Sequence, residues 1–496
     1  MVLAGYSRIP MKPAHEKIDA DAVFREHPLA REILHRLTES GHEAFLVGGV
    51  VRDGLLASWG VPVRFPPSDV DITTSAAPDE IRRILAGRRL VDVGEQFGVL
   101  VILGDDNEGV EVATFRSETG YDGRRPAEVV VAGTLNEDVR RRDLTINGLA
   151  ATDDGTVIDH VDGIKDLRSR RIRAIGDPEI RFAEDYLRML RVVRFACQIE
   201  GEIDRGTSDA IRRRASCIPR IAWERIQVEL LRTLELPNSS RGIELLDDLG
   251  LLEPILPEVH ALHGVPQPEQ YHPEGDVFIH TMIALRVADG FVRDPIVKLA
   301  ILLHDIGKPQ ALRNHQGSHM GGHCLIGANM AKAVARRLKL TRRDTHRLSF
   351  LIRQHMRIAD FPRMGRGRQV RFLAAEERAN ETSIARRYPL FMQLLQVLIA
   401  DCEACAHRSA GWAPILAAVT DVAEHIERVG NLSKARQLFD GHDLIAMGLS
   451  PGPIFGEVLA AVHDRILAGE ISTSEQAHSW AKRELMRKEA ETETLS

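Results

Sequence analysis

Apolar positions along the chain follow two different periods. Residues 26–60 have the pattern of a helix, a buried strand, a glycine turn and a second helix. Short strands are predicted around 89–93, 98–103 and 109–115, the last with alternating apolar and polar positions. From about residue 205 onward the spacing is helical. The pattern therefore predicts an α+β protein in which an α/β head is followed by all-helical domains.

Two features of the head predict a site for a phosphate and its metal ion. Asp69 and Asp71 are one residue apart, so in a β-strand both side chains leave by the same face. Adjacent carboxylates repel each other unless a cation lies between them, and oxygen ligands of this kind suit Mg²⁺. Upstream, Gly48 and Gly49 join a buried strand to a helix that carries Arg52, a turn whose backbone N–H groups can hold an anion. Either feature alone is more often an ordinary turn.

A third carboxylate is expected from the strand around 109–115. If this strand neighbours the aspartate pair, Glu111 completes the composition of a two-metal phosphoryl-transfer site. The alternative is a solvent-facing strand position. Residues 117–126 are polar, contain glycine and lack periodicity, which predicts a mobile loop beside the site.

Composition limits the classes of protein that the chain can represent. At 496 residues with 44% apolar content it has room for several packed domains, and no segment is long or apolar enough to span a membrane. The N-terminal residues lack the apolar core of a signal peptide. The five scattered cysteines favour a reducing cytoplasm over a disulfide framework, and the Cys402–Cys405 pair is interpreted as two ordinary helix residues.

Charge distribution is more informative than the net charge of −6, which by itself predicts no nucleic-acid partner. Arginines crowd the stretch from residue 140 to residue 214. Such local basic density is expected of a groove for a polyanion, and a solvated helix face is the alternative.

The motifs between about residues 44 and 235 together resemble one enzyme family. They are Gly-Gly-x-x-Arg-Asp, Asp-x-Asp, the strand glutamate, Arg-Arg-Asp-Leu-Thr-Ile-Asn and Arg-Phe-Ala-Glu-Asp-Tyr-Leu-Arg. Their order and spacing resemble the class II tRNA nucleotidyltransferase and bacterial poly(A) polymerase family, whose members add CCA, part of it, or adenylates to RNA 3′ ends without a nucleic-acid template. The resemblance implies a polymerase-β-like nucleotidyltransferase head, Mg²⁺ bound by Asp69 and Asp71, and Glu111 as an active-site carboxylate. It also implies nucleotide contacts from Gly48, Gly49, Arg52, Arg142, Asp143, Asn147, Glu184, Asp185, Arg188, Arg191 and Arg194.

The stretch 184–194 suggests how such a protein selects its nucleotide. A helix is predicted here, which makes Arg188 a neighbour of Asp185 and Glu184 on one face. A carboxylate that accepts from an amino group, beside an arginine that donates to a ring nitrogen, fits both adenine and cytosine. Guanine and uracil present the opposite polarity. The alternative is a surface ion pair worth about 0.3–0.5 kcal/mol, and the resemblance implies the template role for Asp185 and Arg188.

A second group of candidate ligands lies on helical, otherwise apolar segments. Histidine and aspartate at such positions lose hydration unless they find a partner, and a metal ion is a common one. A single histidine of this kind is usually a satisfied core residue, but the full series resembles the HD superfamily of metal-dependent phosphohydrolases. The resemblance implies a divalent transition metal held by His280, His304, Asp305 and Asp401, with His323 and His355 able to hold a second ion. Phosphohydrolase activity and a purely structural role both remain open.

The expected organisation combines these features in one chain. The segments are a polar N-terminal extension (1–25), a nucleotidyltransferase head (26–175), a helical neck that contacts RNA (176–262), an HD domain (263–410), a helical tail that holds tRNA (411–488) and a disordered end (489–496). The implied reaction joins CMP, CMP and AMP from CTP and ATP to a tRNA 3′ end and releases pyrophosphate.

Other functions remain as alternatives. A poly(A) polymerase, or an enzyme that adds only part of CCA, would use the same residues. From a different class, the chain could be an HD phosphohydrolase whose head only binds RNA; the three carboxylates Asp69, Asp71 and Glu111 argue against that alternative.

Overall fold

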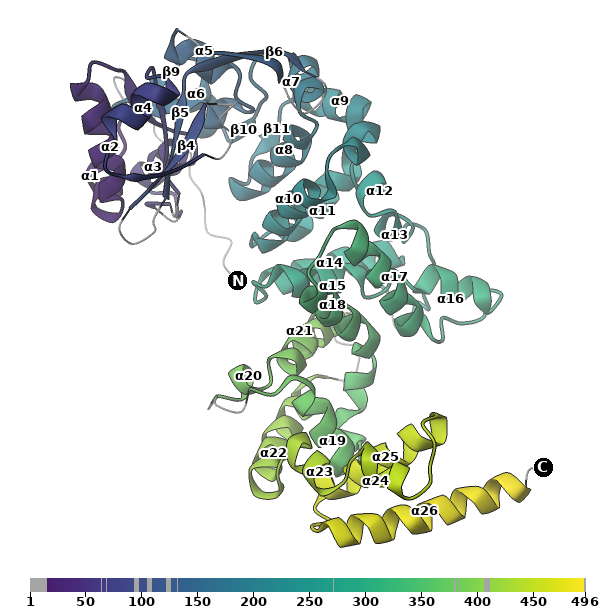
Figure 1. Cartoon of the computed structure of the whole chain (residues 1–496). Helices are drawn as coiled ribbons and strands as arrows, with labels where there is room; N and C mark the ends of the chain where they lie inside the picture. Colours follow the sequence, from purple (N-terminus) through teal and green to yellow (C-terminus); the bar gives the residue numbers. More distant parts are fainter. Residues whose placement is uncertain are drawn as a thin grey trace. The chain divides into compact units, whose positions relative to one another are not determined.

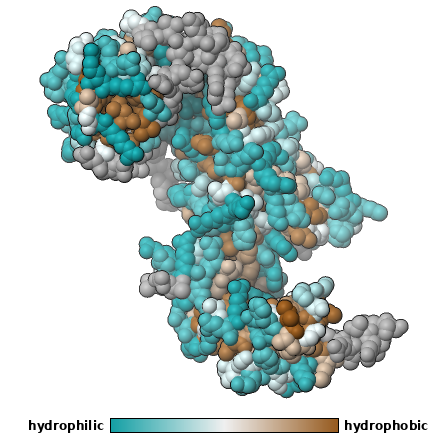
Figure 2. All heavy atoms as spheres, in the orientation of Figure 1, coloured by the Kyte–Doolittle hydropathy of each residue, from teal (hydrophilic) through white to brown (hydrophobic). Residues whose placement is uncertain are grey.

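The computed structural model describes residues 16–63, 65–67, 69–92, 98–104, 109–121, 126–131, 133–270, 272–378, 381, 383–405 and 411–494. The chain forms two compact units. The first contains Met1–Thr233 and Arg241–Ile255, and the second contains Leu234–Ser240 and Leu256–Ser496. Within the described residues, no helix has the length and apolar character that crossing a membrane requires. On the face drawn in Figure 2, hydrophilic residues cover most of the surface and apolar residues form small separate groups.

The first unit is built around a seven-stranded sheet (Figure 1). Its strand order is β3-β4-β5-β2-β1-β8-β9, in which only the pair of β2 and β5 is parallel. The strands are β1 (Ala44–Val47), β2 (Asp71–Thr74), β3 (Arg89–Asp92), β4 (Val99–Leu103), β5 (Gly109–Thr114), β8 (Leu149–Ala151) and β9 (Val157–Asp159). The apolar strand residues Leu46, Ile72 and Val112 are almost completely buried, which confirms the predicted core of the head.

Twelve α-helices, two short 3-10 helices (Thr145–Asn147 and Ala215–Arg220) and two small strand pairs complete the described part of the first unit. The helices are α1 (Ala20–Glu26), α2 (Pro28–Glu39), α3 (Gly49–Ser58), α4 (Pro78–Ile84), α5 (Leu135–Arg140), α6 (Gly163–Arg168), α7 (Pro178–Glu184), α8 (Leu187–Gln198), α9 (Arg205–Arg214), α10 (Trp223–Glu235), α11 (Ser239–Asp248) and α12 (Leu252–Ile255). The last residues of α10 and the first of α11 belong to the second unit. Strands β10 (Arg171–Ile172) and β11 (Glu202–Ile203) pair in parallel.

The described part of the second unit is helical throughout (Figure 1). Its helices are α13 (Pro257–His260), α14 (Val277–Asp289), α15 (Pro295–Leu303), α16 (Lys308–Asn314), α17 (His323–Arg337), α18 (Arg342–Gln354), α19 (Arg366–Leu373), α20 (Ile384–Arg387), α21 (Pro389–Ala404), α22 (Ala413–Val429), α23 (Leu432–Leu438), α24 (Gly441–Ala446), α25 (Pro453–Ala468) and α26 (Ser474–Thr494). Helix α14 packs against α15 and α21, and α18 packs against α15 and α17. The predicted α+β class, with a mixed head before helical domains, is confirmed.

Four local predictions were wrong. Residues 117–126 do not form one irregular loop, because β6 (Arg116–Tyr121) pairs antiparallel with β7 (Pro126–Val131). The valine-rich β7 favours a strand, and polar residues can occupy a two-stranded ribbon that needs no apolar face of its own. Residues 122–125, between the two strands, lie outside the described part.

The other three errors concern helix boundaries. The predicted helix over 184–194 is broken at Asp185, whose backbone is extended and whose side chain accepts from the N–H of Leu187. The end of the chain was expected to be disordered from 489, but α26 continues to Thr494 because alanine, glutamate and lysine favour helix. The extension predicted for 1–25 overlaps α1, which buries Val23 and Phe24; residues 1–15 lie outside the described part.

Candidate active sites

Three carboxylates converge at the parallel pair of strands β2 and β5, in the interior of the sheet. Asp71 at the start of β2 is directly opposite Glu111 on β5. Asp69 precedes β2, so the prediction that both aspartates share a strand is wrong for Asp69, because regular pairing begins only at Asp71. Partial loss of hydration, followed by the charges of Glu111 and Asp69, raises the pKa of Asp71 to about 6, although the residue still faces solvent. Together these groups form an anionic cluster that a cation would relieve.

The glycine turn lies against this cluster. Gly48 has φ of 76° and precedes the first residue of α3, a backbone conformation that side-chain-bearing residues rarely adopt. A Cβ atom on Gly48 would lie 3.7 Å from Asp71 Oδ2 and 3.9 Å from Arg142 Nη1. Gly49 begins α3, so the N-terminus of this helix stands beside the carboxylates and Arg142. The predicted combination of an anion-binding turn and a carboxylate pair is therefore present in one place.

The guanidinium of Arg52, which was expected to contact the nucleotide phosphates, makes several hydrogen bonds within the protein. Its guanidinium donates to both oxygens of Asp53, at 2.8 and 2.9 Å, and to Asn147 Oδ1 at 2.7 Å. The residue is buried and its guanidinium lies 4.9 Å from the ring centroid of Phe195. One N–H on each terminal nitrogen is left over from these bonds, so a phosphate contact must use those two hydrogens.

Asp143, Asn147 and Arg191 form one network, in which Asp143 and Asn147 are buried and Arg191 is partly exposed. Arg191 Nε donates to Asp143 Oδ2 at 2.5 Å, and Asn147 Nδ2 donates to Asp143 Oδ1 at 3.3 Å. Burial alone would raise the pKa of Asp143, but the charge and hydrogen bond of Arg191 outweigh it and lower the pKa to about 2. Arg142 is 3.1 Å from the buried carboxylate of Asp138. The structure therefore brings these predicted nucleotide-binding residues together as mutually supporting groups.

The two residues expected to read the base do not pair with each other. Arg188 donates to Glu184 Oε2 at 2.6 Å and to the carbonyl oxygen of Arg141 at 3.1 Å. Asp185 instead accepts from both terminal nitrogens of Arg225, at 3.2 and 2.6 Å. The predicted proximity of Glu184 and Arg188 is present, whereas Asp185 is turned toward α10 because the helix breaks at this residue.

Two further residues in α10 were missed by the sequence reasoning. Arg225 holds Asp185, and Glu229 accepts from Arg194 Nε at 2.7 Å and lies 3.7 Å from Arg191 Nη1. Their four-residue spacing puts them on one helix face, and this pattern in the sequence could have indicated that they act together. Arg194 is itself buried and paired, so a nucleotide contact from it requires rearrangement of the pair with Glu229.

In the second unit, all six predicted HD residues meet around Asp305. His304 Nε2 lies 3.1 Å from Asp305 Oδ2 and 3.8 Å from Asp401 Oδ1, while His280 Nε2 lies 3.0 Å from Asp401 Oδ1. On the other side, His323 Nε2 is 3.5 Å and His355 Nε2 is 4.0 Å from Asp305 Oδ1. The side chains come from five helices or helix ends that the second unit packs together.

This cluster fits a metal ion. His304 Nε2 and both carboxylate oxygens of Asp305 are buried and make no well-aligned hydrogen bond within the described structure. Buried polar atoms of this kind cost free energy unless they find a partner. Imidazole and carboxylate groups are ligands for Mn, Fe, Ni, Co or Zn, so the donor set suits a divalent transition metal. The neighbouring His323 and His355, whose Nε2 atoms are 3.4 Å apart, offer two further imidazoles.

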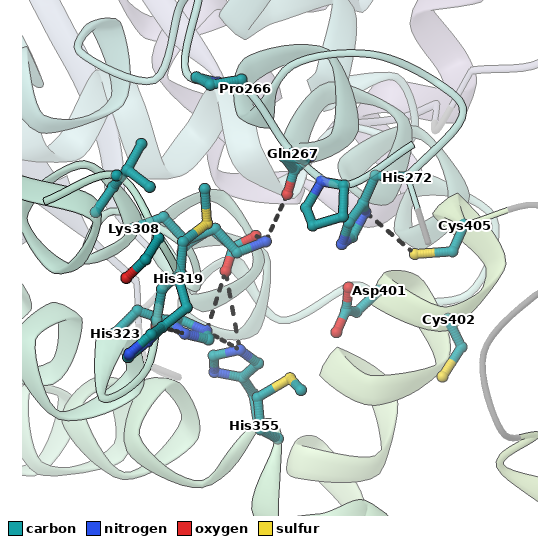
Figure 3. Close-up of a pocket in the computed structure, with 17 residues that line it drawn as sticks. Pro266, Gln267, His272, Lys308, His319, His323, His355, Asp401, Cys402 and Cys405 are labelled. Carbon is teal, nitrogen blue, oxygen red and sulfur yellow. Dashed lines mark hydrogen bonds and ion pairs between the residues drawn. The ribbon is translucent and has the colours of Figure 1, made fainter. Parts of the chain in front are cut away.

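A cavity of about 740 Å³ opens onto the HD cluster (Figure 3). It is lined by Asp305, His323, His355 and Asp401, and also by Lys308, to which the sequence reasoning assigned no role. The ammonium group of Lys308 lies 2.6 Å from Asp305 Oδ2 and donates to Gln267 at 2.6 Å. Its position directly after the His304-Asp305-Ile-Gly run was an available signal. The cavity therefore combines metal ligands, one cation and apolar walls.

Comparisons with known proteins bear out the family resemblance. Residues 44–173 match the poly A polymerase head domain, residues 202–262 match the probable RNA and SrmB-binding site of polymerase A, and residues 271–387 match the HD domain. The CCA-adding enzyme of Levilactobacillus brevis is 47% identical over 227 residues, which is 46% of this chain and 55% of that protein. The CCA-adding enzyme of Bacillus subtilis is 42% identical over 225 residues, or 45% of this chain and 54% of that protein. These alignments thus span about half of each relative.

Solved structures agree along nearly the whole chain. The Bacillus stearothermophilus CCA-adding enzyme in complex with CTP has a TM-score of 0.63 at 24% identity and covers 97% of this chain and 100% of that one. The Thermotoga maritima CCA-adding enzyme complexed with tRNA has a TM-score of 0.54 at 19% identity, covering 96% and 100%. The fold is therefore that of a nucleotidyltransferase head joined to helical domains, as its motif order predicts, and both families represented are metal-dependent.

Proposed function

We propose that this chain is a template-independent tRNA nucleotidyltransferase that adds CMP, CMP and AMP to tRNA 3′ ends from CTP and ATP and releases pyrophosphate. The observation that carries the proposal is the convergence of Asp69, Asp71 and Glu111 beside the Gly48 turn. A triphosphate and its cation are the chemical partners that such an arrangement accommodates. The name of the curated relatives, CCA-adding enzyme, favours CCA addition, and the solved complex of the Thermotoga maritima CCA-adding enzyme with tRNA favours tRNA as the acceptor.

The residues divide the work of nucleotide addition between them. Asp69, Asp71 and Glu111 would hold Mg²⁺, which when bound supplies charge neutralisation at the attacking and leaving oxygens. The N–H groups at the start of α3, with Arg142, hold the triphosphate so that its α-phosphate faces the RNA 3′-hydroxyl.

Base selection is assigned to Asp185 and Arg188. Asp185 accepts from the exocyclic amino group of C or A, and Arg188 donates to the adjacent ring nitrogen. In the structure Asp185 is held by Arg225 and Arg188 by Glu184. Selection therefore requires these side chains to exchange a protein partner for a base. The remaining predicted contacts are assigned to the same site as positioning groups or phosphate ligands. They are Gly49, Arg52, Asp143, Asn147, Arg191 and Arg194.

The domain assignment follows from the same proposal. Residues 26–175 form the transferase head, 176–262 the neck, 263–410 the HD domain and 411–488 the tail that holds tRNA. None of the five cysteines, all of which lie in the described part of the chain, is joined in a disulfide, and this supports the proposal of a reducing cytoplasm.

The test uses tRNA transcripts that end before CCA, after its first C and after its second C. Each is incubated with CTP, ATP or both in the presence of Mg²⁺. Ordered extension of all three to CCA supports the proposal. Extension of the last transcript alone indicates an A-adding enzyme, and long A tails on any RNA indicate a poly(A) polymerase. No extension, with an Asp69→Ala, Asp71→Ala double variant equal to the wild type, overturns it.

A metal-dependent phosphohydrolase activity of the HD domain is the second candidate function. The observation that favours it is that His304 Nε2 and the Asp305 carboxylate, beside the cavity, are buried and have ion-pair contacts but no hydrogen bond in the described structure. Lys308 places a positive charge there for a phosphate group. The test measures the release of phosphate from nucleotide substrates in the presence of added Mn²⁺, Co²⁺ or Ni²⁺. This activity should be lost in Asp305→Asn, and equal activity of that variant and the wild type contradicts the hypothesis.

A further inference from the structure

A second set of metal-ligand side chains lies beside the HD cluster. Asp401 and Cys405 are four residues apart at the end of α21, so they share one side of the helix. His272 and Glu274 precede α14, which packs against α21. Figure 3 shows His272, Asp401 and Cys405 on the same wall of the cavity, with His272 and Cys405 in contact. Two segments far apart in the sequence thus bring nitrogen, oxygen and sulfur ligands together.

The distances between these groups are close to those in a coordination sphere. His272 Nδ1 lies 3.0 Å from Glu274 Oε1 and 3.6 Å from Cys405 Sγ. Ligand atoms of His272, Glu274, His280 and Cys405 all lie within 4.8 Å of one another. In a tetrahedral site with bonds of about 2.0–2.3 Å, neighbouring ligand atoms are about 3.3–3.7 Å apart. The separations of His272 from Glu274 and from Cys405 are within a few tenths of an ångström of these values.

Hydrogen bonds alone do not satisfy these groups. If His272 Nδ1 carries a proton for Glu274, it has no lone pair left to accept from the Cys405 thiol. If it carries none, its lone pair faces a carboxylate oxygen at 3.0 Å. In addition, the Glu274 side chain is 8% exposed and its Oε2 is buried without a hydrogen-bond partner in the described structure. A cation removes both conflicts, because the lone pair, the carboxylate and the thiolate all become ligands.

We propose that His272 Nδ1, the Glu274 carboxylate and Cys405 Sγ form a divalent-metal site of the zinc class, distinct from the HD cluster. The mixed nitrogen, oxygen and sulfur ligands suit Zn²⁺ better than Mg²⁺. His280 connects the two sites, because its Nδ1 is 2.7 Å from Glu274 Oε1 and its Nε2 is 3.0 Å from Asp401 Oδ1. Since His272 and Cys405 line the cavity, the remaining coordination position faces it and takes water or an oxygen atom of a bound ligand.

The experiment loads the metal-depleted full chain with Co²⁺ and records its absorption spectrum. A thiolate ligand gives a sulfur-to-Co²⁺ charge-transfer band in the near ultraviolet, which imidazole and carboxylate ligands do not. The wild type should show this band and Cys405→Ser should lack it. His272→Ala should weaken Co²⁺ binding by roughly tenfold or more. The zinc content of the purified protein should fall by one equivalent in Cys405→Ser.

Two other cysteines provide controls. Cys402 lies on the same helix, is buried and lines the same cavity, so Cys402→Ser should keep the band. Cys324, whose Sγ is 3.5 Å from His323 Nε2, tests whether a thiolate at the HD cluster is responsible. Absence of the band from the wild type, its persistence in Cys405→Ser, or its loss in Cys324→Ser or Cys402→Ser would overturn the assignment. Circular dichroism and nucleotide addition verify that each variant is folded.

Discussion

Asp185 accepts two hydrogen bonds from Arg225, whereas Arg188, three residues after Asp185, pairs with Glu184. The carboxylate of Asp185 is therefore oriented by a residue of α10, 40 positions later in the chain. Its backbone is extended, so neighbouring helical turns do not fix its direction. The proposed reading of C and A thus depends on a residue outside the motif that carries it.

Substitution of Arg225 should impair both the rate and the selectivity of nucleotide addition. In Arg225→Ala, Asp185 loses its bidentate partner and keeps only the hydrogen bond from the N–H of Leu187, so its carboxylate is held less firmly. We expect catalytic efficiency with CTP and ATP to fall about 100-fold, the size of effect that misplacement by about 1 Å produces. Discrimination against UTP and GTP should fall as well. Steady-state incorporation of all four nucleotides into a tRNA transcript measures both quantities.

The matched control for Arg225 is Arg212→Ala. Arg212 lies on α9 in an exposed ion pair with Asp209 at 3.2 Å, and such pairs contribute little. This variant should retain wild-type rates. If Arg225→Ala retained them too, the contact with Asp185 would have no role in positioning.

Loss of one carboxylate at the β2–β5 strand pair should strongly decrease addition without abolishing tRNA binding. Asp71→Asn removes a proposed ligand and also part of the repulsion with Glu111. Since loss of a group that merely orients a ligand costs 10–100-fold, we expect a decrease of more than about 100-fold. The metal-depleted variant should melt at a higher temperature than the metal-depleted wild type at neutral pH.

The control for Asp71 is Asp79→Asn. The side chain of Asp79 is 96% exposed in the first turn of α4. Single-turnover addition and filter binding of tRNA separate chemistry from binding. Equal activity of Asp71→Asn and the wild type would remove this site from the reaction.

The sequence predicted strands around Asp71 and Glu111, and the role of the third carboxylate depended on these strands being neighbours, which they are. Alternating apolar positions predict each strand, and burial on one face leaves a strand few possible registers. The HD residues were likewise predictable, since polar groups in apolar helix faces need partners. In both cases the local pattern and the packing impose the same constraint.

The partners of Arg52, Asp185 and Arg194 could not be predicted in this way. Each of these side chains has several charged groups within reach along the sequence, and the contact made depends on how distant segments pack. The break at Asp185 has the same origin, because a side chain that bonds its own backbone competes with the helix. Helical periodicity alone does not reveal that competition.

The Asp143–Arg191 pair should make the first unit sensitive to acid. Arg191 lowers the pKa of Asp143 from its ordinary 3.8 to about 2, so the ionised form is favoured by folding. The resulting stability, about 2 kcal/mol, is fully present above the unfolded pKa and is lost as pH falls through the folded pKa. In Asp143→Asn this contribution is absent. The difference in free energy of unfolding between wild type and variant should therefore shrink between about pH 5 and about pH 2.

Urea titration followed by circular dichroism at several pH values measures that difference. A constant difference in the free energy of unfolding between the two proteins across this pH range would show that Arg191 does not stabilise the ionised Asp143 carboxylate. Arg191→Gln should reproduce the loss of the acid-dependent contribution, because it removes the partner rather than the titrating group.

Removal of divalent metal should destabilise the second unit. His304 and Asp305 leave buried atoms without hydrogen bonds that a bound ion would engage. At a free metal concentration about 100 times the dissociation constant, binding stabilises the folded state by about 2.7 kcal/mol. We expect a chelator to lower the melting temperature and added Mn²⁺ or Co²⁺ to restore it. In Asp305→Asn the metal should have little effect; an undiminished shift in that variant would assign the ion to other groups.

The helical tail should depend on a close approach of α19 to α25 at Gly367. A Cβ atom at this position would lie 1.8 Å from the carbonyl oxygen of Asp464, so Gly367→Ala forces the two helices apart. Because the obstacle is backbone, rotation of a side chain cannot relieve it, and we expect a loss of about 1–3 kcal/mol in the free energy of unfolding.

Gly365→Ala is the matched control, since a Cβ there meets no atom within 4 Å. If the tail holds tRNA as proposed, Gly367→Ala should also weaken tRNA binding while Gly365→Ala does not. Urea unfolding and filter binding of both variants check the two effects, and equal stability of the pair would mean that α19 and α25 can separate without cost.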